Sequence, residues 1–117
     1  MNTIAYPEKH SEAEIQALLW YFLRKKKIDA RLEVTAHIPY KRRSSRLDLV
    51  VFVGKDARCI VECKSWSDNY SRTAIYRTNN TKQINKYKTT YGLPVLVCAR
   101  MSYVVPTVSL VEKILKI

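Results

Sequence analysis

The chain has 117 residues and carries 21 Lys and Arg against 10 Asp and Glu, which gives a formal net charge of +11. Because a domain typically holds about 100–150 residues, this length favours a single domain over residues 1–117 with one hydrophobic core. No apolar run approaches the roughly 18–20 residues that cross a bilayer, and residues 1–8 lack the basic start and apolar stretch of a secretory signal. We therefore expect a cytoplasmic or nucleoid-associated protein that is not secreted and does not bind a membrane.

The N-terminal part of the chain predicts a helix followed by a strand. Ser11 and Glu14 have the spacing of a capping box, in which Ser11 is the N-cap. Apolar residues then recur at helical spacing and predict a helix to about Lys26. Apolar and polar residues alternate over 32–38, which indicates a strand with one polar face. A basic loop over 39–45 follows.

The rest of the chain predicts three further strands and two helices. Two apolar runs, 47–53 and 58–64, flank a short polar sequence and indicate a β-hairpin. Next come a helix that ends at Gly92, a buried strand over 94–99, and a last helix that begins at Pro106. The order helix, three strands, helix, strand, helix predicts an α/β fold in which helices flank a mixed central β-sheet.

The hairpin register brings two acidic residues together. With the turn centred on Lys55, Val50 lies opposite Ile60 and Asp48 lies opposite Glu62. The Cβ atoms of directly opposed residues are only about 4.5–5.5 Å apart. We therefore expect two carboxylates to converge on one face of the hairpin.

Paired carboxylates repel each other and destabilise a sheet unless something offsets the repulsion. A divalent metal, the nearby Lys64 ammonium, a shared proton or water could do so, and oxygen ligands suit Mg²⁺ or Mn²⁺. The simpler alternative is a sheet end at which both acids are hydrated. Apolar neighbours on both faces of the two strands indicate covered central strands and favour a site over that alternative.

These residues resemble the signature of the PD-(D/E)XK nuclease superfamily. That signature is an Asp at the start of one strand, followed on the next strand by Glu or Asp, any residue, and Lys. Asp48, Glu62 and Lys64 match it, and Leu47 stands in place of the Pro that gives the family its name. The resemblance implies a restriction-endonuclease-like αβββαβ core, and it extends over residues 14 to about 98.

The resemblance also implies roles for these residues in metal-dependent hydrolysis of phosphodiesters. Asp48, Glu62 and the backbone carbonyl of Cys63 would bind Mg²⁺, for which Mn²⁺ could substitute. Lys64 would orient the attacking water or stabilise charge on the phosphate in the transition state.

Two more positions fit the family pattern. Glu14 matches the acidic residue that many members carry on the first helix, and it would hold metal-bound water or a second metal, directly or through water. Alternatively, it only closes the capping box. Residues 83–87 resemble the Q-x-x-x-Y helix of RecB-like members. On this pattern Gln83 would position Lys64 or the phosphate, although a solvated helix face remains an alternative.

The positive charge predicts a nucleic-acid partner, because Lys and Arg that neutralise phosphates release counterions. An anionic membrane usually needs a basic amphipathic helix or a lipid anchor, neither of which is evident. The alternative is a set of solvated charged faces. We expect DNA contacts from seven residues of the basic loop and the second predicted helix: Lys41, Arg42, Arg43, Arg46, Lys82, Lys86 and Tyr87.

Together these patterns predict a divalent-metal-dependent DNA endonuclease. One active site cuts one strand, so a chain this small would act as a homodimer, and its brevity favours recognition of branched DNA such as a Holliday junction over a long sequence. The alternatives are a sequence-specific restriction or homing endonuclease, a non-catalytic DNA-binding module, or a subunit of a larger nuclease complex. RNA is a less favoured substrate.

Overall fold

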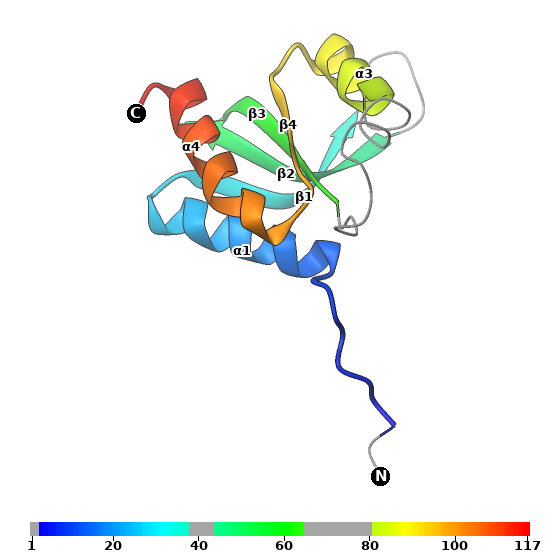
Figure 1. Ribbon diagram of the computed structural model, residues 1–117. Coiled ribbons are helices and arrows are strands. Elements are labelled where there is room, and N and C mark those ends of the chain that lie inside the picture. The colour runs from blue at the N-terminus through cyan, green and yellow to red at the C-terminus, as the bar shows by residue number, and fades with distance from the viewer. Residues whose placement is uncertain (1–2, 38–43, 65–80) are drawn as a thin grey trace.

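The computed structural model describes residues 3–37, 44–64 and 81–117 (Figure 1). Its elements in chain order are α1 (Glu12–Lys25), β1 (Asp29–His37), β2 (Ser44–Val53), β3 (Asp56–Cys63), α3 (Thr81–Tyr91), β4 (Val95–Cys98), the 3₁₀ helix η2 (Met101–Tyr103) and α4 (Val104–Leu115). Within the described residues, this is the expected order of helix, three strands, helix, strand and helix.

The four described strands form one mixed sheet in the order β1-β2-β3-β4. β1 pairs with β2 and β2 with β3 in antiparallel fashion, whereas β3 and β4 are parallel. Helices α1 and α4 lie on one face of the sheet, and α3 lies on the other (Figure 1). The expectation of an α/β fold with helices around a mixed sheet is therefore confirmed.

Helix α1 begins at the predicted cap and supplies much of the core. The Ser11 hydroxyl accepts a hydrogen bond from the Glu14 backbone N–H at 3.2 Å, which satisfies a donor that the first helical turn leaves unpaired. One stripe of the helix, Ile15, Leu19 and Leu23, is buried against the sheet and α4. The expected end near Lys26 is correct to within one residue.

The β2–β3 hairpin corrects the expected turn but keeps the expected register. Val53 pairs with Asp56, so the loop is the two residues Gly54 and Lys55, and Gly54 has φ +63°. A β-bulge follows, in which Arg58 is the extra residue.

The bulge restores the register that matters for the candidate site. Beyond it, Val50 pairs with Ile60 and Leu49 pairs with Val61, as expected. The turn was therefore placed one residue too wide, and the extra bulge residue compensates for the difference. The next positions along the two strands are Asp48 and Glu62.

Strand β1 differs from the expected alternation at Glu33. It begins at Asp29, earlier than predicted, and Glu33 has φ +51°, a left-handed conformation that is unfavourable for residues with a side chain. Leu32 lines a pocket beside α1, whereas Val34 packs on the opposite face of the sheet. The prediction that Leu32 and Val34 share a face was therefore wrong, because the kink at Glu33 lies between them.

Candidate active site

At the end of the β2–β3 pairing, the side chain of Asp48 accepts a hydrogen bond from β3 in place of a backbone carbonyl of β2. Leu49–Val61 is the last regular pair, and the Asp48 Oδ2 atom then accepts a hydrogen bond from the Cys63 backbone N–H at 2.8 Å. This hydrogen bond fixes the position of the Asp48 carboxyl group beside the end of β3.

The Cys63 carbonyl points to the same side of β3 as its N–H. The N–H groups of Ile60 and Lys64 donate to the carbonyls of Pro94 and Cys98 on the β4 side, at 2.9 and 3.0 Å. Backbone groups alternate along a strand, so the N–H and C=O of Cys63 both face β2. The Cys63 carbonyl therefore faces the strand that carries Asp48.

Glu62 is a buried acidic residue of β3, with only 4 % of its surface exposed. Burial raises the pKa of Glu62 to about 8, and a hydrogen bond to Asp48 and the negative charge of Asp48 also raise it. The Lys64 charge and the Asp48 backbone act in the opposite direction. The convergence of the two carboxyl groups is therefore present, and Lys64 is close enough to act on Glu62.

One oxygen of Glu62 lacks a partner. Its Oε1 atom is buried and accepts no hydrogen bond, a situation that is costly for a polar atom in a protein interior. A cation bound at this oxygen would remove that cost. Mg²⁺ is commonly held by one or two carboxylates with several waters, so Asp48, Glu62 and the Cys63 carbonyl form a suitable oxygen set.

Within residues 3–37, 44–64 and 81–117, no group of three or more His, Cys, Asp or Glu side chains converges as a metal site. Glu14 in particular is oriented toward other partners. Its Oε2 atom lies 2.8 Å from His10 Nδ1 and its Oε1 atom 3.4 Å from Ser11 Oγ. The hydrogen bond to His10 lowers the pKa of this exposed carboxyl. The structure therefore shows the capping box, and a metal-ligand role for Glu14 stays a prediction.

Gln16 is a residue near the site that the sequence analysis missed. From α1, its Nε2 atom donates to the backbone carbonyl of Asp48 at 3.2 Å in a partly buried contact. This bond ties the first helix to the strand residue that holds the carboxylate. No local sequence pattern predicts this hydrogen bond, because the two residues are 32 positions apart.

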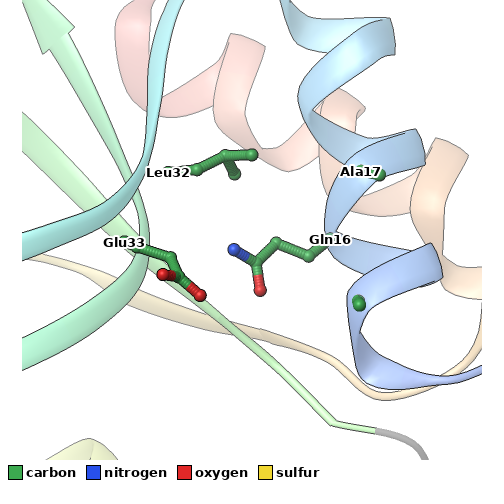
Figure 2. Close-up of a pocket in the computed structure, with 5 residues that line it drawn as sticks. Gln16, Ala17, Leu32 and Glu33 are labelled. Atoms are coloured by element: carbon green, nitrogen blue, oxygen red, sulfur yellow. The ribbon is translucent and has the colours of Figure 1, made fainter.

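A pocket of about 430 Å³ lies between α1 and β1 beside this contact. It is lined by Ala13, Gln16, Ala17, Leu32 and Glu33. Figure 2 shows the Gln16 and Glu33 side chains pointing toward one another across it. Glu33 also lies 3.5 Å from the guanidinium of the exposed Arg46. The kinked part of β1 therefore lies directly across from the part of β2 that carries Asp48.

The structure does not describe the side chains of most of the residues expected to bind DNA. Lys41, Arg42 and Arg43 lie outside the described residues. Lys82, Gln83 and Tyr87 belong to α3, but their side chains lie outside the described part of the chain. Lys86 is exposed on α3, and Arg46 is exposed beside Glu33.

Comparison with known proteins adds no relative. No family model, curated protein or solved structure matches the chain. Among the described residues, no helix is both long enough and apolar enough to cross a membrane. The site must therefore be interpreted from its own chemistry.

Proposed function

We propose that this protein is a divalent-metal-dependent DNA endonuclease with a PD-(D/E)XK type of active site. The observation that carries the proposal is the pairing of Asp48 with the buried Glu62, whose Oε1 atom has no partner. The Cys63 backbone and Lys64 complete the same constellation. A buried acid pair of this kind costs stability, and carboxyl groups with such raised pKa values cluster at functional sites.

The residues divide the work between binding and charge stabilisation. Asp48, Glu62 and the Cys63 carbonyl would hold the metal ion. When bound, Mg²⁺ would polarise the scissile phosphate and lower the pKa of a coordinated water. Lys64 would orient the attacking water or stabilise the negative charge that develops on the phosphate.

Glu62 must lose its proton before it can bind a cation. A protonated carboxyl is a poor ligand for a cation, and burial favours the protonated form. The neighbouring Lys64 favours the ionised form and so prepares Glu62 to bind. Lys64 thus has two tasks, because it lowers the proton affinity of Glu62 and supplies a positive charge for phosphate.

The proposed substrate is branched DNA, cut by a homodimer. A single centre of this type cleaves one strand, so two chains would be needed to cut a junction symmetrically. The net charge of +11 suits a phosphate backbone. Recognition of shape needs fewer base contacts than recognition of a long sequence, which suits a chain of 117 residues.

The proposal is tested by incubating the purified protein with linear duplex, single strand, flap, splayed arm and four-way junction, in Mg²⁺ or in EDTA. We expect metal-dependent incision, with paired cuts in the junction. Glu62→Gln should reduce the rate at least about 100-fold, since even partners outside the ligand set change metal affinity about 10–100-fold. Glu8→Gln, the same substitution in an exposed N-terminal residue, should not change the rate.

Two outcomes would overturn the proposal in different ways. Cleavage that persists in Glu62→Gln would remove the acid pair from the mechanism. Tight DNA binding without cleavage of any substrate would instead indicate a non-catalytic binding module or a subunit that needs a partner.

A further inference from the structure

The end of the molecule away from Asp48 gathers three segments that are distant in sequence. The C-terminal end of α1 leads into β1, whose first residue Asp29 pairs with Phe52 near the β2–β3 turn. The C-terminal end of α4 lies beside that of α1, because Lys26 Nζ is 2.7 Å from Glu112 Oε1. Figure 1 shows the C-terminal end of α1, the start of β1 and the C-terminus of the chain on the same side of the molecule.

Acidic side chains at this end are already paired. Asp29 Oδ1 lies 3.1 Å from Arg24 and 2.7 Å from Arg31, and Glu112 pairs with Lys26. In these contacts two acidic side chains form ion pairs with three basic ones. They leave little negative charge for the remaining basic residues of the same segments.

Six other basic residues stand at this end, and all are exposed. Among the described residues, none of the six forms an ion pair, and the only further acid in these segments is Asp56 of the turn. We call them the distal basic surface: Lys25, Lys27, Lys55, Arg58, Lys113 and Lys116.

Helix ends explain only part of this charge. The C-terminal ends of α1 and α4 carry partial negative charge, which favours cations in the last turn. Lys25 and Lys113 fit that explanation. Lys55 and Arg58 do not, because they belong to the hairpin. The surface therefore holds more positive charge than its own fold requires.

The distal basic surface is separate from the candidate active site. Val53, at the end of β2, is five residue steps along the strand from Asp48, which corresponds to about 17 Å at roughly 3.3 Å per residue. A phosphate held at Asp48 and Glu62 is therefore too far away to contact these cations directly.

We propose that the distal basic surface binds the sugar–phosphate backbone of duplex DNA at a second position on the molecule. The cations stand on three packed elements, two helices and a hairpin, rather than on one amphipathic helix. The apolar stripes of α1 and α4 are buried in the core, so they are not available to insert into a membrane. An array of exposed lysines and arginines with few counter-charges is the arrangement that releases counterions from DNA.

This inference goes beyond the proposed nuclease activity and does not need it. Binding is measured in EDTA, where no metal-dependent cleavage occurs, so loss of the nuclease proposal would leave the test intact. The affinity for a fluorescent DNA duplex is measured over a range of salt concentrations. The slope of log affinity against log salt then reports the number of phosphate contacts.

Two double variants neutralise different elements of the surface: Lys25→Gln with Lys27→Gln, and Lys113→Gln with Lys116→Gln. Each should reduce the magnitude of the slope by about 2, because each phosphate contact contributes about 0.9. The control, Lys9→Gln, removes one charge from an exposed position before α1 and should leave the slope almost unchanged, whereas each charge removed from the distal basic surface should reduce it by about 0.9. Thermal unfolding verifies that the variants remain folded.

Equal slopes for both surface variants and the wild type would refute the proposal. An equal loss per charge removed in the surface variants and the control would also refute it, because that would indicate a general effect of net charge. A third contrary result is loss of binding to phosphatidylserine vesicles with DNA binding unchanged, which would assign the surface to a membrane.

Discussion

Glu62 combines deep burial with an ionisable group, and this combination links stability to pH. Burial and the Asp48 charge raise the pKa of Glu62 from 4.5 to about 8, so the folded protein retains a proton that the unfolded chain releases. The stabilising effect of that proton is complete below pH 4.5 and is lost as pH rises toward about 8. Above that range, folding must bury a charged carboxylate.

We expect the metal-free protein to lose stability as pH rises through this range, by at most about 1.4 kcal/mol per pH unit. Glu62→Gln keeps the size of the side chain and removes its titration, so its stability should change much less with pH. Denaturant unfolding in EDTA at several pH values measures both. Glu8→Gln should retain the wild-type pH dependence, and an equal slope in Glu62→Gln would show that Glu62 is not the titrating group.

The side chain of Gln16 donates a hydrogen bond to the backbone carbonyl of Asp48. Gln16 would therefore position Asp48 without contacting a bound metal itself. Gln16→Met keeps most of the side-chain volume and removes the donor, which should cost about 1 kcal/mol of stability. We also expect a lower affinity for Mn²⁺, measured by calorimetry without DNA, because the Asp48 segment loses a restraint. A purely structural Gln16 would change the unfolding free energy and leave the Mn²⁺ affinity of the folded protein unaltered.

At the scale of elements, the β2–β3 hairpin depends on Gly54. This residue has φ +63°, and a Cβ atom built on it would meet nothing within 4 Å. The cost of Gly54→Ala is therefore conformational rather than steric, and we expect a destabilisation of about 1–2 kcal/mol. Lys55→Ala at the next loop position should cost less than half as much in the same denaturant titration. Equal effects would mean that the turn does not require a left-handed residue.

Much of the arrangement of elements could be predicted because it follows from local patterns. The capping box at Ser11 and the apolar stripe of α1 are encoded within a few residues. The hairpin strands were recognisable from their apolar runs. The turn was misplaced because two-residue loops with a bulge and wider loops give the same register farther along the ladder. The proximity of Asp48 and Glu62 was unaffected by this error.

The remaining features of the site depend on contacts between distant residues. The positive φ of Glu33 has no local signal, since Glu rarely adopts a left-handed conformation. It separates Leu32 from Val34, so simple alternation failed there. The bond from Gln16 to Asp48 likewise depends on how α1 packs on the sheet. Glu14 also contacts His10, a neighbour that the capping-box pattern does not include.

On the scale of the whole molecule, the described basic residues are not confined to the candidate site. Arg46 and Lys64 are close to it, whereas the distal basic surface lies at the other end of the sheet. On these proposals, the distal basic surface would hold the DNA backbone at one end, while a metal ion at Asp48 and Glu62 would bind the scissile phosphate near the other. The two proposed functions would then be separable, because the acid pair would serve cleavage and the distal cations would serve affinity.

Cleavage and DNA affinity should therefore respond to different substitutions. Asp48→Asn should abolish cleavage and keep or increase DNA affinity, because it removes a negative charge beside the phosphate. Lys113→Gln with Lys116→Gln should weaken binding and retain the cleavage rate at saturating DNA. Gel-shift titrations and single-turnover cleavage measure the two quantities. Loss of DNA affinity in a folded Asp48→Asn protein would mean that Asp48 serves binding itself.

The most direct test of the Asp48–Glu62 pair as a metal centre is calorimetric titration of the DNA-free protein with Mn²⁺. We expect a binding isotherm for the wild type and for Glu8→Gln, and none for Asp48→Asn or Glu62→Gln. This result would show that the buried acids hold the cation on which the proposed hydrolysis depends. Equal binding by all four proteins, or by none of them, would contradict a metal site at this position.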